Sequence, residues 1–204
     1  MQENPVFSAI LERRSVRRYT NKALTKEEIE KIIEAGRFAP SAKNAQPWRF
    51  IVITKRELIA ELSRGIRKVM ASIVKFRFAL KLFSSDLRTP ANIRSLKNHA
   101  ENEKDTIFFE APVLILVVCK KEHFREMSCA CAAENMMLAA HSMSLGSCWI
   151  GYVRFLKLLA GSTKKAGVPK GHNIAAAIVF GHPENGNVNA PKRKEEAGII
   201  KWIE

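Results

Sequence analysis

The sequence has few cysteines and none of the spacings that usually accompany their chemistry. Its 204 residues include four cysteines, at positions 119, 129, 131 and 148, and no C-x-x-C. That is too few for a disulfide scaffold, so buried thiols are favoured over a metal site. Cys129 and Cys131 would lie about 200° apart on a helix, and the five histidines have no metal-ligand spacing. We expect no metal, and we interpret His141 as a satisfied core histidine.

Long apolar runs are also missing. The longest, Ala111 to Cys119, is strand-sized, whereas a membrane-spanning helix needs about 18 residues or more. The N-terminus has no basic region followed by an apolar stretch. We therefore expect a cytoplasmic protein without a membrane span. With 47% hydrophobic and 26% charged residues, the chain has a globular composition, and its length suits a single domain over residues 1–204.

Acidic residues are scarce as well. The chain has 34 Lys and Arg against 20 Asp and Glu, a net charge of +14, and no acid between Ser63 and Ser85. Such a charge attracts nucleic acid, acidic membrane surfaces or phosphorylated ligands, and does not choose among them. For the basic stretch 63–83, a solvated helix that packs its apolar stripe (Val69, Ile73, Phe76, Leu80, Phe83) on the core or on a dimer partner is favoured. A lid for an anionic substrate or for NADPH phosphates, and a membrane-surface helix, are the alternatives.

Hydrophobic periodicity predicts helices that alternate with strands. Thr25 and Glu28 form a capping-box signature, and Val113 to Val118 has the β-branched composition of a buried strand. The predicted helices are Val6–Arg13, one opened by Thr25 and reaching Gly36, Glu57–Phe83, Asn92–Phe109 and Ser128–Met143; the predicted strands are Trp48–Thr54, Val113–Val118, Ser147–Tyr152 and Ile174–Gly181. This order favours an α/β or α+β sandwich.

Three separate segments carry polar or flexible residues where regular structure begins or ends. Arg13 to Tyr19 holds four arginines and a serine, which suit a phosphate or a solvated basic helix end. Pro40 to Trp48 combines Ser, Asn and Gln side chains with two prolines. In Leu145 to Gly151, two glycines permit close backbone approach to a flat ligand or form a tight turn. Each segment alone is ambiguous.

Together, and in this order, the three segments resemble the nitroreductase family of FMN-dependent oxidoreductases. The resemblance rests on Arg-Arg-Ser-Val-Arg-Arg-Tyr from Arg13, Ala-Pro-Ser-Ala-Lys-Asn-Ala-Gln-Pro-Trp from Ala39, and Gly-Ser-Cys-Trp-Ile-Gly from Gly146. It implies a nitroreductase-like α+β sandwich with a central mixed or antiparallel sheet flanked by helices. It also implies an intertwined homodimer with FMN at the interface. A variable basic helical insert (about 57–109) and an extended C-terminal tail (about 182–204) would belong to the same domain.

The resemblance also implies which residues bind the cofactor. The N-terminal motif would hold the phosphate, ribityl chain and pyrimidine edge, the proline-flanked loop would reach the flavin from the partner subunit, and the third motif would lie against the isoalloxazine with backbone groups near N5. A late basic element would return to the phosphate through Arg193, with Lys192 or Lys194 alongside. The implied cofactor-binding residues are Arg13, Arg14, Ser15, Arg17, Pro40, Ser41, Ala42, Asn44, Gln46, Trp149, Ile150, Gly151, Lys192 and Arg193.

The implied activity is ping-pong electron transfer from NADH or NADPH, through FMN, to a small acceptor such as a nitroaromatic or quinone. The cofactor carries this chemistry, so we name no catalytic acid, base or nucleophile. A flavin-binding relative with redirected chemistry, such as dehalogenation or flavin fragmentation, is the first alternative. A basic nucleic-acid-binding protein is the second, and the absence of a recognised reading motif weighs against it.

Overall fold

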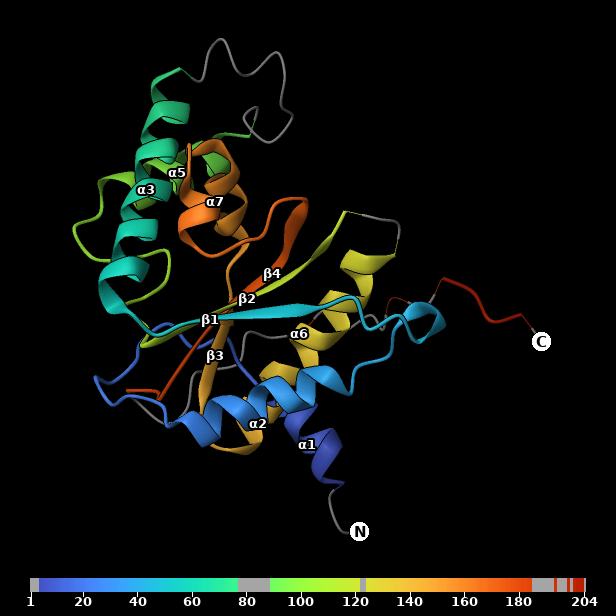
Figure 1. The fold of residues 1–204 in the computed structure, drawn as a ribbon. Coiled ribbons are helices and arrows are strands. Elements are labelled where there is room, and N and C mark those ends of the chain that lie inside the picture. The colour runs from blue at the N-terminus through green and yellow to red at the C-terminus, as the bar shows by residue number, and fades with distance from the viewer. Residues whose placement is uncertain are drawn as a thin grey trace.

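The protein forms a four-stranded antiparallel sheet with helices on both faces. The computed structural model describes residues 4–76, 89–121, 124–184, 193, 198 and 200–203. Its strands are β1 (Arg49–Ile53), β2 (Val113–Lys120), β3 (Gly146–Trp149) and β4 (His172–Gly181), in the order β1-β2-β4-β3 (Figure 1). All three strand pairs are antiparallel, which gives the predicted α+β fold.

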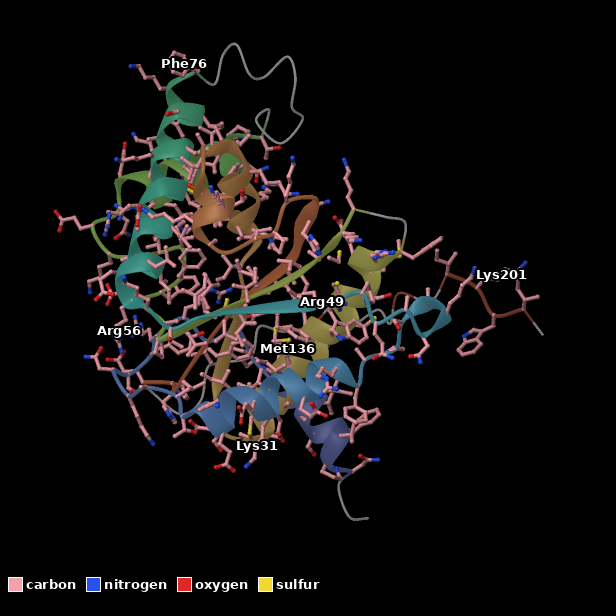
Figure 2. The ribbon with its side chains drawn as sticks, viewed as in Figure 1. Lys31, Arg49, Arg56, Phe76, Met136 and Lys201 are labelled. Atoms are coloured by element: carbon pink, nitrogen blue, oxygen red, sulfur yellow. The ribbon has the colours of Figure 1, made fainter. Side chains whose placement is uncertain are left out.

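Each face of the sheet is covered by its own set of helices (Figure 1). One face packs on α2 (Lys26–Arg37) and α6 (Arg125–Ser142), and Figure 2 shows Met136 between α6 and α2. The other carries α3 (Arg56–Lys75), α5 (Pro90–Glu101), the 3-10 segment η3 (Gly151–Leu158) and α7 (Ser162–Lys165). Strand β2 alternates between the two cores: Val113 faces the first and Leu114 the second. Both are fully buried, as the sequence pattern predicted.

The predicted elements are all present, with shifted bounds. Helix α2 begins at the predicted capping box, in which Thr25 and Glu28 exchange hydrogen bonds. Helix α5 ends at Glu101, earlier than predicted, because Asn102 has extended backbone angles. Strand β3 ends at Trp149, and η3 begins two residues later at Gly151; neither η3 nor α7 was predicted.

Helix α3 packs through a longer stripe than the predicted one. Its buried apolar residues include Ile59, Leu62 and Ile66, which precede the predicted stripe, whereas Phe76 after its last turn is 58% exposed. Phe76 therefore does not pack on the core of its own chain, and the prediction omitted the apolar residues of the first turns. Val69 and Ile73 do pack against the core, and Leu80 and Phe83 lie outside the described residues.

Helix α1 (Pro5–Glu12) stands outside the two layers, at the lower edge of Figure 1. None of its eight residues is buried, although four of them are large and apolar. Their exposed fractions run from 53% to 64%: Val6, Phe7, Ile10 and Leu11. Its own chain therefore leaves this helix's apolar face in solvent.

The cysteines behave as the sequence indicated. Cys119, Cys129 and Cys148 are buried free thiols and Cys131 is exposed, so Cys129 and Cys131 point apart. Burial, with Cys119 beside it, raises the pKa of Cys129 to about 12. Among the described residues there is no cluster of three or more potential metal ligands. No helix in the described part of the chain is long and apolar enough to cross a membrane.

Candidate cofactor site

The first and third sequence motifs lie side by side along the free edge of β3. Residues Ser15 and Ser147 form a parallel bridge, and the Val16 N–H donates to the Ser147 carbonyl at 2.9 Å. The approach is so close that a Cβ added at Gly146 would lie 2.9 Å from the Val16 side chain. Glycine is therefore required at position 146 for the two motifs to meet.

A cavity of about 290 Å³ opens where these motifs meet. Two arginines and two serines face it, together with an acid, a histidine and apolar groups. Its lining residues are Glu12, Arg13, Arg14, Val16, His141, Ser144, Leu145, Gly146, Ser147 and Pro183. Guanidinium and hydroxyl donors in one cavity suit a phosphate or another small oxyanion.

Three of the motif's four arginines are held differently. Arg13 Nε lies 3.5 Å from Glu134 Oε1 of α6, and its side chain is 19% exposed. Arg14 Nη1 turns back to the Leu11 and Arg13 carbonyls at 2.5 and 2.8 Å, at the C-terminal end of α1. Arg17 lies over the Phe109 ring, 6.0 Å from its centroid, and does not line the cavity. The structure thus brings Arg13 and Arg14 into the cavity and leaves Arg17 beside it.

The groups around Cys148 show how closely the basic motif packs on β3. Burial raises the pKa of the Cys148 thiol, while the Arg17 charge, a hydrogen bond with Ser15 and the Arg13 charge act in the opposite direction. Burial prevails, so the thiol stays protonated at neutral pH and packs as an apolar group. Ser15, Arg13 and Arg17 therefore converge on the middle of β3.

The predicted flavin-facing residues at the end of β3 have unequal exposure. Trp149 is 39% exposed, whereas Ile150 is 3% exposed and donates its N–H to the Ala177 carbonyl at 2.8 Å. That N–H is therefore not available to a ligand. Gly151 is exposed, and a Cβ added there would meet nothing within 4 Å. Of the three residues, Gly151 offers the most open backbone to a flat ligand.

The proline-flanked loop is a stiff, exposed projection. Its backbone includes three non-glycine residues with positive φ, namely Lys43, Asn44 and Gln46. The Gln46 N–H donates to Ser41 Oγ at 3.0 Å, and Gln46 Nε2 donates to Asn44 Oδ1 at 3.1 Å. Trp48, 4% exposed, anchors its base. These contacts hold the polar side chains in place while leaving them in solvent.

This loop and the cavity lie apart within one chain. Figure 1 shows the short helix η1 (Ala42–Asn44) at the right-hand edge, well away from β3. No residue of the loop lines the cavity. Within one chain, the predicted loop residues therefore lie together and away from Arg13. They are Pro40, Ser41, Ala42, Asn44 and Gln46.

The C-terminal basic element is only partly described. Arg193 is exposed and is not among the cavity's lining residues, while Lys192 and Lys194 lie outside the described residues. The assignment of these residues to a phosphate stays a prediction.

Sequence reasoning missed several cavity residues. His141 was interpreted as a core histidine, and this was wrong: its side chain is 32% exposed, lines the cavity, and places Nε2 4.0 Å from Glu12 Oε2. The available signal was its position in the last turn of α6, directly before the glycine motif. Ser144, which has a positive φ in the following turn, lines the same cavity.

The sheet and the cavity define an α+β protein with a cavity on a sheet edge, lined by arginines and serines that suit an oxyanion. The model of the nitroreductase family matches residues 10–182, which include all three motifs. The chain therefore belongs to the nitroreductase family.

Similar proteins agree with this assignment. The chain is 28% identical to a nitroreductase with bound FMN from Bacteroides fragilis, covering 98% of this chain and 100% of that one, with a TM-score of 0.78. A BluB-like flavoprotein from Clostridium difficile is 26% identical over 98% of this chain and 99% of its own, with a TM-score of 0.77. Among curated relatives, the FMN reductase (NADPH) of Bacillus subtilis is 27% identical over 95% of this chain and 72% of its own.

Proposed function

We propose that this protein is an FMN-dependent oxidoreductase that transfers electrons from NADH or NADPH to a small acceptor such as a nitroaromatic or quinone. The observation that carries the proposal is the cavity at Arg13 and Arg14, where two nitroreductase motifs are joined by backbone pairing. Similar solved structures contain FMN, and curated relatives include FMN reductases that use NADPH or NAD(P)H.

The cavity's chemistry fits the phosphate end of this cofactor. Arg13 and Arg14 supply charge, Ser144 and Ser147 supply polar groups, and Val16 and Leu145 supply apolar walls. Its volume of about 290 Å³ lies just below the roughly 300–1,000 Å³ typical of complete cofactor and ligand sites. We therefore assign it the phosphate and part of the ribityl chain, with the flavin ring beyond it, toward Trp149 and Gly151.

When bound, FMN supplies the redox chemistry by accepting two electrons from a reduced nicotinamide and passing them to the acceptor. The protein's residues bind and orient. Arg13 and Arg14 hold the phosphate, Ser15 is fixed by its pairing with Ser147, and the open Gly151 lets a flat ring approach the backbone. Arg17, beside Phe109, adds positive charge that would favour an anionic reduced ring.

We further propose that the protein is a homodimer whose partner completes each site. Two observations support this: α1 exposes four large apolar residues, and the loop at Ser41, Asn44 and Gln46 is held by internal hydrogen bonds but does not line the cavity at Arg13 of its own chain. Contiguous exposed apolar surface of this kind usually marks an interface. In the dimer, the loop would reach the partner's cofactor, Arg193 would return to the phosphate with Lys192 or Lys194 alongside, and the protein would work in the cytoplasm.

The experiment that tests the function joins cofactor analysis to kinetics. Purified, dialysed protein should release about one FMN per chain, identified by mass. Initial rates at several NADH or NADPH and acceptor concentrations should then give parallel double-reciprocal lines, the pattern of ping-pong turnover. A protein that binds FMN but oxidises neither nicotinamide would favour redirected chemistry. A colourless protein that takes up no added FMN would contradict the proposal.

Subunit mixing tests the shared site. A chain carrying Arg13→Gln and Arg14→Gln and a chain carrying Asn44→Ala and Gln46→Ala should each bind FMN poorly alone. Refolded together in equal amounts, half the dimers are mixed, and each mixed dimer has one intact site. About one quarter of the sites should then recover. No recovery beyond the two separate preparations would contradict a site built from two chains.

A further inference from the structure

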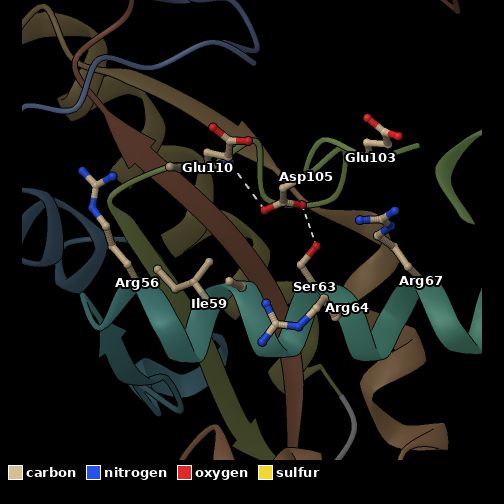
Figure 3. Close-up of a pocket in the computed structure, with 10 residues that line it drawn as sticks. Arg56, Ile59, Ser63, Arg64, Arg67, Glu103, Asp105 and Glu110 are labelled. Carbon is tan, nitrogen blue, oxygen red and sulfur yellow. Dashed lines mark hydrogen bonds between the residues drawn. The ribbon is translucent and has the colours of Figure 1, made fainter. Parts of the chain in front are cut away.

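A second and larger cavity lies between α3 and the loop 102–111. Its volume is about 360 Å³, and it shares no lining residue with the cavity at Arg13. Figure 3 shows helix α3 along one side and the loop along the other, with Ser63 and Asp105 directed toward each other across the space between them. Its size lies within the range of small-molecule sites.

The two walls of this cavity carry opposite charges. All of its cations come from α3, where Arg56, Arg64 and Arg67 lie one, two or three turns apart and so share a face. All of its acids come from the loop, namely Glu103, Asp105 and Glu110 (Figure 3). The walls are therefore segregated by charge while the lining as a whole is electrically balanced.

Within the described residues, these charges do not neutralise each other by contact. No ion pair within 4.0 Å joins an arginine of α3 to an acid of the loop. Arg56 donates instead to Asn21 Oδ1 and the Asn21 carbonyl at 3.2 and 3.0 Å, and Arg67 donates to the Asn102 carbonyl. The Nε atom of Arg67 is buried without an acceptor, and Arg64 has no hydrogen bond or ion pair in the described chain. The cationic wall thus has unused donors.

The acidic wall is fixed and still able to accept. Asp105 Oδ1 takes hydrogen bonds from the buried Ser63 hydroxyl at 2.6 Å and from the Ile107 and Phe108 N–H groups at 2.9 and 3.0 Å. Its Oδ2 has a single long contact, 3.4 Å from the Glu110 N–H. The Glu103 and Glu110 side chains are exposed and have no ion pair within the described residues. These oxygens can receive an ammonium group.

We propose that this cavity binds a small zwitterion of the α-amino acid class, with its carboxylate toward the arginines of α3 and its ammonium toward the carboxylates of the loop. A simple anion would meet the acids as well as the arginines, and a simple amine would meet the arginines as well as the acids. A ligand with both charges is favoured at both walls. Ile59, Ala60 and Ala111 line the same space and suit an apolar side chain.

The test uses three ligands that differ only in their charged groups: L-phenylalanine, 3-phenylpropanoate, which lacks the ammonium, and 2-phenylethylamine, which lacks the carboxylate. Isothermal titration of the full-length protein with its cofactor should show L-phenylalanine binding about tenfold or more tightly than either analogue. Binding is read directly, so the result does not depend on whether the protein reduces any acceptor.

Two variants assign the charges to their walls. Arg64→Gln should weaken L-phenylalanine about tenfold or more and leave the amine unchanged, whereas Glu110→Gln should weaken L-phenylalanine and leave the carboxylate analogue unchanged. Lys68→Gln, an exposed position of α3 outside the cavity, is the control and should change nothing. Equal binding of L-phenylalanine and 3-phenylpropanoate, no binding of any ligand at millimolar concentration, or equal effects of Arg64→Gln and Lys68→Gln would each overturn the proposal.

Discussion

The cavity at Arg13 and the loop at Asn44 both carry family motifs, but their surroundings differ. At the cavity, the basic motif pairs with β3 through Ser15 and Ser147, and its arginines contact groups of the same chain. The loop is equally well defined by internal hydrogen bonds, yet its polar side chains are exposed. One half of the proposed cofactor site is thus preformed within a chain, while the other, in the dimer that we propose, is preformed for the partner chain.

The largest expected effect comes from breaking the proposed dimer, which would part the loop of one chain from the cavity of the other. Phe7→Ser removes a 64% exposed phenyl ring from α1. Because a two-fold dimer would bury two copies, we expect dimer association to weaken by about 3 to 6 kcal/mol, with loss of FMN. Light scattering after size exclusion, with the FMN content of each peak, measures both.

The control for this variant is Phe76→Ser. Phe76 is 58% exposed and lies at the opposite end of the molecule from α1 (Figure 2). We expect this variant to leave dimer and cofactor intact. If the two variants dissociate the protein equally, α1 is not the interface.

The next effect concerns the pairing of the basic motif with β3. Gly146→Ala places a Cβ 2.9 Å from Val16, and overpacking of this kind costs about 1 to 3 kcal/mol of the free energy of unfolding. Adding Val16→Ala to this variant should restore much of the lost stability. Gly151→Ala, where the added Cβ meets nothing within 4 Å, should leave stability unchanged and lower FMN affinity. Urea unfolding and FMN titration of the three variants measure both properties. A Gly151→Ala protein less stable than Gly146→Ala would refute the prediction.

Removing one of the arginines assigned to the phosphate is expected to cost a similar or smaller free energy, in this case of FMN binding. Arg13→Gln should lower FMN affinity about 10- to 100-fold, because hydrogen bonds to a charged group contribute about 1.5 to 3 kcal/mol. Arg37→Gln, which breaks only a surface pair with Glu34, should have no effect. Fluorescence titration of FMN compares them, and equal affinities would remove Arg13 from the site.

The smallest expected effect concerns the capping box of α2, which lies outside both the cavity and the loop. Changes there are expected to alter stability without altering cofactor binding. Hydrogen bonds from Thr25, first of all from its backbone N–H, hold the pKa of Glu28 below its ordinary value. This contribution is present above the unfolded-state pKa of about 4.3 and is lost as pH falls through the lower folded-state pKa.

Thr25→Ala should cost about 1 kcal/mol at neutral pH, and the stability difference between the wild type and Glu28→Gln should shrink in acid. Both variants should retain FMN at neutral pH. Thermal unfolding at several pH values measures this difference. A stability difference between the wild type and Glu28→Gln that grew as the pH fell would contradict the prediction.

The sequence predicted the fold better than the spatial arrangement of the site. Periodicity and the Thr25 capping box identified every major helix and strand, because those signals are local. The pairing of Ser15 with Ser147 joins residues far apart in the chain, and its one trace in the sequence is Gly146, where the close approach leaves no room for a Cβ. The role of His141 was missed for a related reason: its cavity exists only where the basic motif crosses the end of α6.

The charged cavity beside α3 was not predicted, because charge along a sequence does not reveal which groups face each other. Arg64 and Arg67 were predicted to belong to a basic surface helix, and Arg56 lies just before the predicted start of that helix. The loop that carries Asp105 was predicted as the end of a helix, which would have placed its acids elsewhere. The early end of α5 at Glu101 is what brings them opposite the arginines.

The unburied helix α1 also bears on how the molecule assembles. Eight residues are too few for a stable isolated helix in water, and its own chain holds it by little more than Arg13–Glu134 and the neighbouring Glu12 and His141. This helix leads directly into Arg13, so its order governs the order of the two arginines to which we assign the phosphate. If it completes its folding only on a partner, subunit encounter precedes cofactor capture, and dilution alone would release the flavin.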